Sequence, residues 1–345
     1  MPRTRKIAEA NESKKDAFVP KPHHDRILMA MYQHHFMTVE QVTRLLYSSG
    51  SISKVRSLLA ALAAPKEING KKIEGYLVSF HEPRPTPVGS TPKIYTLSLR
   101  GFNHLKKLGV SQLLRFREPD SDELEKNYLF LKHNLAVTDF LIAAKLVEKV
   151  SPRIELYEFL HERALKQQPP LIATVEKRTP DGEPMLSGDG KVAMQTIRLY
   201  LDGFMDFRVS LEDRDKPVRF CLLLELDRKT ESELDIRRKI RGLLTAVKSG
   251  ECLKRFGTRN PTVAFANAVG GQARREQLKG WAEAELKKTK EPRYWTEMFV
   301  FADLPTEGTI DVEELFLSPV WYLPFQDKPS VLIRVGHDKQ IAVNT

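Results

Sequence analysis

The chain has 345 residues, of which 41% are hydrophobic and 29% are charged, a balance that is ordinary for a soluble globular protein. No apolar run reaches the ~18 residues that a membrane span needs, and the basic, polar start of the chain does not resemble a secretory signal. Lysine and arginine number 55 against 45 acidic residues, and the formal net charge of +10 favours a polyanionic partner such as nucleic acid.

This length is more than one hydrophobic core usually spans, so we expect two domains, preceded by a disordered basic tail over residues 1–21. Cys221 and Cys252 lie in apolar or helical stretches without paired metal-ligand spacing, which predicts a reduced, cytoplasmic setting and no zinc site. The chain also lacks a Gly-Lys-Ser/Thr phosphate loop and a paired-histidine motif beside a catalytic tyrosine. An NTPase motor and a rolling-circle relaxase are therefore disfavoured.

Residues 22–116 predict a winged helix-turn-helix domain. A first amphipathic helix, "HHDRILMAMYQHH", precedes "FMTVEQVTRLLY", in which Thr38 is the expected N-cap and Gln41 its capping-box partner. A short Gly/Ser turn then leads into a third helix, "KVRSLLAALAA". Two alternating stretches, "EGYLVSF" and "PKIYTLSL", flank the Pro/Gly-rich wing "HEPRPTPVGST", and "RGFNHLKKLG" closes the unit as a fourth helix.

In such a domain the polar positions of the third helix enter the major groove of DNA, and basic residues around them contact phosphates. The alternative is that these residues form the solvated faces of a winged helix that binds protein. The expected groove residues are Ser53, Lys54, Arg56 and Ser57, and the expected phosphate contacts are Arg44, Lys71, Lys72, Arg84 and Lys93.

Residues 117–127 are charged and without apolar periodicity, and they predict a linker. Residues 128–333 then predict an α/β domain: a long helix, a strand "IELYEFL", a long loop or hairpin tip over residues 166–191, and a strand-helix-strand-helix-strand series in a mixed sheet. The helix after "VRFCLLLELD" is expected to begin at Thr230, with Glu233 in its capping box. Residues 334–345 form a tail without functional signal.

Carboxylates gather on two neighbouring strands of this domain. Asp202 and Asp206 flank "GFM", and Glu225 and Asp227 end the most apolar strand of the chain. Residues two apart in a strand share a face, so three or four carboxylates converge if these strands pair. Oxygen ligands of this kind select Mg²⁺ or Mn²⁺, which can hold a phosphate and activate water for phosphodiester hydrolysis.

The order of these segments resembles the replication-relaxation family of plasmids and other mobile elements, with a PD-(D/E)xK nuclease-like domain. The resemblance extends from about Arg26 to Pro324 and rests on the winged helix, "LKHNLAVTDF", "LDGFMDF", "LLLELDRKTES", "RRKIRGLL" and "LFLSPVWYLP". It implies a restriction-endonuclease-like mixed sheet flanked by helices, with Asp202, Glu225 and Asp227 as ligands of Mg²⁺ or Mn²⁺.

Two positions depart from the nuclease pattern. "LDG" stands where that pattern has Pro-Asp, and Asp227 stands where Glu-x-Lys has its lysine. A lysine there stabilises the attacking hydroxide or the developing phosphorane charge. Lys229 and Lys239 are the available substitutes, and we prefer Lys239 because a capped helix can hold it over the carboxylates.

The resemblance implies a DNA-binding protein of a plasmid or mobile element that acts in replication or relaxation and nicks or cleaves DNA with a divalent metal. Two alternatives stay open: a non-catalytic DNA-binding replication accessory, and a transcriptional regulator with a degenerate nuclease fold. In either of these, Asp227 would cap the next helix and pair with Arg228 or Arg237. The expected partners are double-stranded DNA and replication or mobilisation proteins, with a homodimer left open and no membrane.

Overall fold

The computed structural model describes residues 20–68, 71–81, 92–110, 116, 128–179, 182–289, 293–306 and 308–335. Contacts divide the chain into two compact units, Met1–Leu135 and Ala136–Thr345, with the boundary inside one long helix, α7 (Tyr128–Val150). The predicted linker, nearly all of the predicted wing and most of both predicted tails lie outside the described residues. The predicted domain boundaries therefore stay predictions.

The N-terminal unit contains the predicted series of helices and strands. A three-stranded antiparallel sheet has the order β1-β5-β4, and an additional hairpin, β2–β3, follows the third helix of the series. The helices are α2 (Pro22–His34), α3 (Val39–Leu46), the short 3-10 turn η1 (Ser49–Ser51), α4 (Ile52–Ala63) and α5 (Leu99–Lys107). The strands are β1 (Met37–Thr38), β2 (Lys66–Ile68), β3 (Lys71–Ile73), β4 (Leu77–His81) and β5 (Lys93–Leu97).

The predicted capping box at the start of α3 is confirmed. The Gln41 backbone N–H donates to Thr38 Oγ1 at 3.2 Å, and the Thr38 N–H donates to Gln41 Oε1 at 3.0 Å. These two bonds satisfy donors that a helix start otherwise leaves unpaired, so the turn between α2 and α3 has a defined end. The helix then buries Val42 completely.

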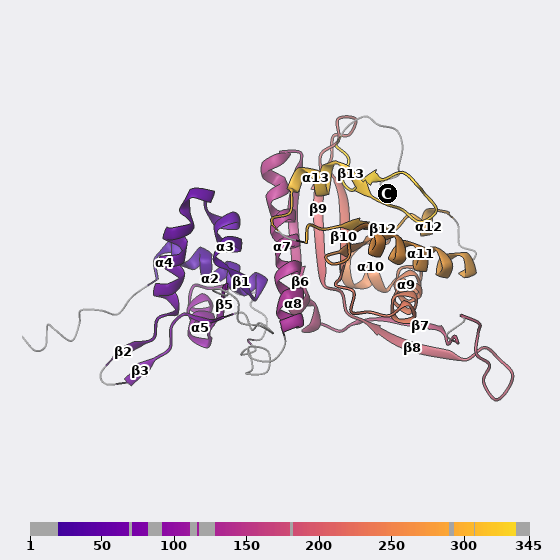
Figure 1. Ribbon diagram of the computed structural model, residues 1–345, viewed down its shortest axis with the longest axis horizontal. Coiled ribbons are helices and arrows are strands. Elements are labelled where there is room, and N and C mark those ends of the chain that lie inside the picture. Colours follow the sequence, from indigo (N-terminus) through magenta and orange to yellow (C-terminus); the bar gives the residue numbers. More distant parts are fainter. Residues whose placement is uncertain are drawn as a thin grey trace, which may run out of the picture. The chain divides into compact units, whose positions relative to one another are not determined.

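The second unit is built on a five-stranded mixed sheet with the order β12-β11-β10-β9-β6 (Figure 1). Its first three strands in sequence pair antiparallel; β11 then joins β10 in parallel, and β12 joins β11 in parallel. This confirms the predicted mixed sheet, in which the apolar strands β10 and β11 occupy inner positions. The strands are β6 (Ile154–His161), β9 (Gly203–Val209), β10 (Val218–Asp227), β11 (Thr262–Asn267) and β12 (Phe299–Asp303).

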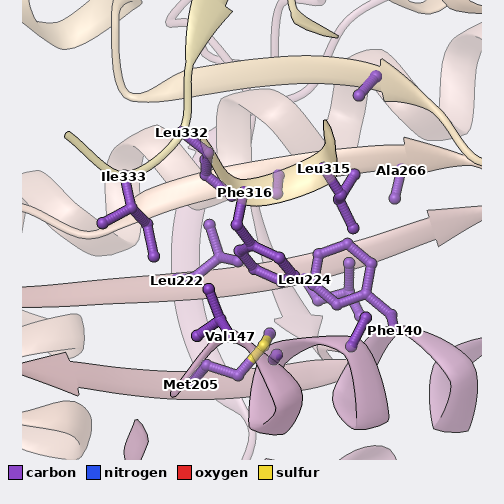
Figure 2. Packing of buried hydrophobic residues seen from close by; sticks show 14 of the residues in the cluster. Phe140, Val147, Met205, Leu222, Leu224, Ala266, Leu315, Phe316, Leu332 and Ile333 are labelled. Carbon is purple, nitrogen blue, oxygen red and sulfur yellow. The ribbon is translucent and has the colours of Figure 1, made fainter. Parts of the chain in front are cut away.

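Helices cover both faces of this sheet, which explains why β10 is apolar at successive positions rather than at every second one. Leu222 and Leu224 pack on one face, where Figure 2 shows them with Phe140 and Phe316. Leu223 packs on the other face. The face of Leu222 and Leu224 is covered by α7 and α13 (Val312–Leu317), with β13 (Pro319–Trp321) and β14 (Ser330–Val331) beside them. The face of Leu223 is covered by α9 (Glu233–Lys248), α10 (Glu251–Phe256) and α11 (Gly271–Thr289).

Two local predictions for this unit need correction. Of the two expectations for residues 166–191, a long loop or a hairpin tip, the hairpin is the correct one, since β7 (Leu171–Glu176) pairs antiparallel with β8 (Met194–Leu199). The strand β7 itself was not predicted, and it buries alternate side chains in the core that α9 also enters. The N-cap of α9 is Ser232, whose Oγ accepts from the Asp235 N–H at 3.3 Å, and not Thr230. Lys229 adopts a positive φ of 59°, so the chain turns and continues for three residues before the helix starts.

The other helices of the unit are α8 (Glu162–Lys166) and α12 (Arg293–Thr296). Among the helices within the described ranges, none is long and apolar enough to cross a membrane.

Leu224 is fully buried at the centre of the sheet, so Leu224→Ala should lower the free energy of unfolding by about 2–5 kcal/mol. Leu234→Ala is the matched control, because Leu234 is 48% exposed and the same substitution there should cost about 0.5 kcal/mol or less. Urea unfolding followed by tryptophan fluorescence measures both. Equal destabilisation of the two variants would contradict the placement of Leu224 in the core.

Candidate metal centre

Asp202 is fixed where β9 begins and β10 ends. Its backbone N–H donates to the Leu224 carbonyl at 3.0 Å, and its Oδ2 accepts the Leu226 N–H at 2.7 Å. The antiparallel register places Gly203 opposite Leu224, so the residue before β9 reaches the end of β10. Pairing of the two strands therefore sets the position of the Asp202 carboxylate.

Glu225 and Lys239 form an ion pair beside Asp202. Lys239 Nζ lies 2.7 Å from Glu225 Oε2 and 2.9 Å from Glu231 Oε1. The Glu225 side chain is 4% exposed, and that of Lys239 is 21% exposed. Lys239 comes from α9, the helix predicted to hold it over the carboxylates, and the structure shows that contact.

The charged groups of this cluster shift one another's pKa values. Burial raises the pKa of Glu225 to about 8; the Lys239 ammonium opposes that rise, and the neighbouring Asp202 carboxylate adds to it. Burial disfavours the ammonium of Lys239, but Glu225, Glu231 and Asp202 outweigh burial and raise the pKa of Lys239. Lys239 thus stays charged at neutral pH, and the crowded carboxylates retain a proton. A bound divalent cation would supply the same charge compensation.

Glu162 is a third acidic residue of the cluster, and the sequence reasoning missed it. It directly follows β6, and His161 at the end of β6 pairs with Gly203, so Glu162 comes next to Asp202. Carboxylate oxygens of Glu162 and Asp202 lie within 4.8 Å of each other. Glu162 also forms an ion pair with Lys166. The available signal was an acid directly after "IELYEFLH", a strand that borders β9.

Glu162, Asp202 and Glu225 therefore lie at the same end of three adjacent strands, β6, β9 and β10. All three offer hard oxygen atoms, which are ligands that Mg²⁺ or Mn²⁺ accepts. Their neighbours include the Lys166 and Lys239 ammonium groups and the Leu226 backbone N–H.

Asp227 has a different partner from the one predicted. Arg274 of α11 donates to both of its oxygens, from Nε to Oδ2 at 2.8 Å and from Nη2 to Oδ1 at 2.9 Å. The Lys229 backbone N–H donates to Oδ2 as well. With both oxygens engaged, the geometry does not support Asp227 as a metal ligand. The predicted pairing with Arg228 or Arg237 is replaced by the ion pair with Arg274.

Two further expectations about the cluster are corrected by the register. Asp206 lies opposite Cys221, four residues along β10 from Glu225, or roughly 13 Å at the rise of a strand. It forms ion pairs with Arg208 and Arg219 and does not join the other carboxylates. Lys229 lies past the end of β10 and so does not extend the strand face toward the cluster.

The predicted DNA-contacting residues lie on the N-terminal unit. Val55 and Leu59 are buried on one side of α4, and the four predicted groove residues are exposed on the rest of the helix. Among the predicted phosphate contacts, Arg44 is half-buried and Arg84 lies outside the described residues. The exposed groove residues are Ser53, Lys54, Arg56 and Ser57; Lys72 of β3 and Lys93 of β5 are exposed too, and Lys71 lies in β3.

Comparison with known proteins places the chain in a family. Residues 28–259 match the model of the family described as Replication-relaxation, which is more than half of the chain. The chain belongs to the replication-relaxation family. The matched part includes the N-terminal helices and the acidic cluster with Lys239, and it ends before β11 and the helix that carries Arg274. No curated protein and no solved structure matches the chain.

The raised pKa of Glu225 predicts how stability depends on pH in the metal-free protein. The folded state keeps the Glu225 proton up to about pH 8, whereas an unfolded glutamate releases it at 4.5, so this group favours unfolding increasingly as pH rises through that window. Glu225→Gln removes the titration. In EDTA, the melting temperature of the variant relative to wild type should therefore increase from the lower to the upper end of the window.

Glu313→Gln, at an exposed position, is the control and should show a constant difference from wild type. A constant difference for Glu225→Gln as well would mean that Glu225 is not protonated in the folded, metal-free protein.

Proposed function

We propose that this replication-relaxation protein is a metal-dependent DNA endonuclease or nickase that acts on a plasmid or mobile element. The observation that carries the proposal is the Lys239 ammonium 2.7 Å from Glu225, beside the carboxylates of Asp202 and Glu162. Carboxylates with one fixed lysine are the groups that phosphodiester hydrolysis needs, because negative charge develops on the phosphate as water attacks.

Each residue of the cluster then has a role. Glu162, Asp202 and Glu225 would hold Mg²⁺ or Mn²⁺, which when bound supplies Lewis-acid stabilisation of the phosphate and a more acidic water. Lys239 stabilises the charge that develops on the phosphate oxygens, the role that the lysine of Glu-x-Lys has in the nuclease pattern. Glu231 restrains the Lys239 side chain through its own ion pair, so the ammonium does not need to be ordered during the reaction.

The architecture supports the assignment to a nuclease-like fold. The acids lie at the ends of adjacent strands of a mixed sheet: Glu162 follows β6, Asp202 precedes β9 and Glu225 lies near the end of β10. The next helix after β10, α9, brings the lysine to Glu225. The lysine comes from this helix and not from the position two residues after the glutamate. The position that usually carries the lysine can therefore be occupied by Asp227. Asp227 is then free for a structural ion pair with Arg274.

DNA binding is assigned to the N-terminal unit as a winged helix. The series α2, α3, η1 and α4 followed by the β4–β5 pair supports this, as does the exposure of Lys54 and Arg56 on α4. The net charge of +10 favours approach to a polyanion. The N-terminal unit would position the protein on double-stranded DNA, and the second unit would act on the backbone.

One observation favours the alternative of a non-catalytic DNA-binding accessory. Glu225 and Asp227 are each paired with a cation of their own domain, Lys239 and Arg274. A degenerate nuclease fold that serves as a scaffold would have the same closed ion pairs. The two functions differ in whether DNA is cleaved when metal is present.

Cleavage of supercoiled plasmid in Mg²⁺ or Mn²⁺ tests the enzyme. We expect wild type to convert it to open-circular or linear DNA, and Asp202→Asn, Glu225→Gln and Lys239→Gln each to lower the rate by about a hundredfold or more. Glu313→Gln, on the exposed surface of α13, is the control that should keep the wild-type rate.

If Asp202→Asn and Glu225→Gln both cleave plasmid at the wild-type rate, the reaction takes place at a different site. Wild type that binds DNA but never cleaves it, with either metal, would favour the accessory role.

DNA binding is tested by its salt dependence. Replacing Lys54 and Arg56 together by alanine should weaken binding and reduce the slope of log affinity against log salt by about 1 for each phosphate that a side chain no longer neutralises. The control removes two exposed lysines from the end of α5, Lys106 and Lys107, and should leave the slope close to wild type. Fluorescence anisotropy with labelled duplex DNA measures both. Equal slopes for all three proteins would contradict a DNA-reading role for α4.

A further inference from the structure

A second charged site lies in the same unit, between β7 with its following turn, α9 and α11. It is a cavity of about 580 Å³. Arg178 comes from the segment after β7, Arg241 from α9, and Lys288 from the end of α11. The residues used below that line it are Thr174, Arg178, Gly182, Arg241 and Lys288.

Two arginines that line this cavity, Arg178 and Arg241, belong to a buried cluster in which positive charge exceeds negative charge. The Glu285 side chain is 1% exposed and accepts from three guanidinium groups: Arg178 Nη1 at 3.1 Å, Arg241 Nη1 at 3.2 Å and Arg237 Nε at 3.4 Å. All three guanidiniums are about nine-tenths buried. One buried carboxylate therefore balances three buried cations.

Other carboxylates contact two of these arginines but compensate their positive charge only weakly. Glu176 contacts Arg178 with its side chain 41% exposed, and Glu233 contacts Arg237 with its side chain 47% exposed. Water screens such exposed carboxylates strongly, so their attraction for a buried cation is small. Glu183 also lines the cavity, 3.7 Å from Lys288 Nζ, but its side chain is 75% exposed and is screened in the same way. The buried charges next to the cavity are therefore predominantly positive.

Arg241 carries the least compensated of these charges. Its Nε is buried and has no hydrogen-bond partner among the residues that the structure describes, which is a costly state for a charged donor. Burial lowers the pKa of Arg241, Glu285 opposes that fall, and the positive charges of Arg178 and Arg237 add to it. A fold that needed only to join α9 to α11 would not require a third guanidinium on the same carboxylate.

We propose that this cavity binds a phosphate group, either of the DNA backbone or of a free nucleotide. Guanidinium forks match phosphate oxygens, and Lys288 adds a point charge. Gly182 lies beside these cations with a φ of +83°, and a Cβ there would clash with Lys288 Nζ and lie 2.8 Å from Arg237 Nη2. At Gly182 itself the backbone thus comes close to the cations without a side chain at that position. A bound phosphate would supply the missing negative charge.

The competing interpretation is a structural clamp, in which Glu285 and its arginines only tie the β7–β8 hairpin to α9 and α11. A clamp predicts effects on stability alone. The phosphate site predicts effects on anion affinity at residues that line the cavity but are not part of the Glu285 cluster.

Isothermal titration of the full-length protein with inorganic phosphate, in EDTA and at constant ionic strength, tests the site. Because no divalent metal is present, the result is independent of the proposed metal centre. Lys288→Gln removes a charge from the wall, and Thr174→Glu adds a repulsive one at an exposed position. The controls are Lys287→Gln, exposed on the same helix, and Thr309→Glu, exposed in the loop before α13; neither position lines the cavity.

We expect wild type to bind phosphate saturably. Lys288→Gln and Thr174→Glu should each weaken the affinity by roughly threefold to tenfold, the effect of changing one partly exposed charge. Both control variants should keep the wild-type affinity. Competition by thymidine 5′-monophosphate alone would identify a free nucleotide, and competition by an oligonucleotide without terminal phosphates would identify the DNA backbone. Absence of saturable binding, or equal affinity in all five proteins, would overturn the proposal. Lower melting temperatures with unchanged phosphate affinity would establish the clamp instead.

Discussion

The antiparallel pairing of β9 with β10 is the constraint on which the rest of the second unit depends. Asp202 joins the strands through its backbone N–H and its side chain, at the point where β10 changes from apolar to acidic. A slip of one residue would turn Glu225 into the apolar core on the opposite face of the sheet and place Leu224 at the position that now faces Lys239. The burial of β10 on both faces therefore also fixes the acidic cluster.

Burial explains why charges at the end of β10 occur in compensated sets. Glu225 has Lys239, and Asp227 has Arg274, and each partner comes from a helix that covers the same face of the sheet. An unpaired charge at such depth costs several kcal/mol, so a carboxylate there needs a cation, a proton or a metal ion. Glu225 differs from Asp227 because it shares its cation with Glu231 and has Asp202 beside it. The excess negative charge is thus localised at Glu225 and Asp202, which makes this the place for a divalent cation.

The sequence predicted those parts that depend on local pattern. The mixed sheet and the capping box at Thr38 followed from periodicity and caps, and the contact of Lys239 with a carboxylate followed from the resemblance to the nuclease pattern. Contacts between distant segments were not accessible in this way. Arg274 lies 47 residues from Asp227, and Glu162 reaches Asp202 only because β6 happens to be the neighbour of β9. The strand β7 was missed because its alternation lies in a segment rich in turn residues.

Helix α9 shows how one element can serve two charged sites. Lys239 lies two positions from both Arg237 and Arg241, which is roughly 200° around the helix, so Lys239 faces the acidic cluster while the two arginines face Glu285. Arg237 and Arg241 are four residues apart and share a side, as that period requires. The apolar residues Ile236, Ile240, Leu243 and Leu244 keep the helix on the sheet between these two sites. A change that rotated α9 would disturb both charged sites together, and for this reason each site has to be tested with substitutions that leave its packing intact.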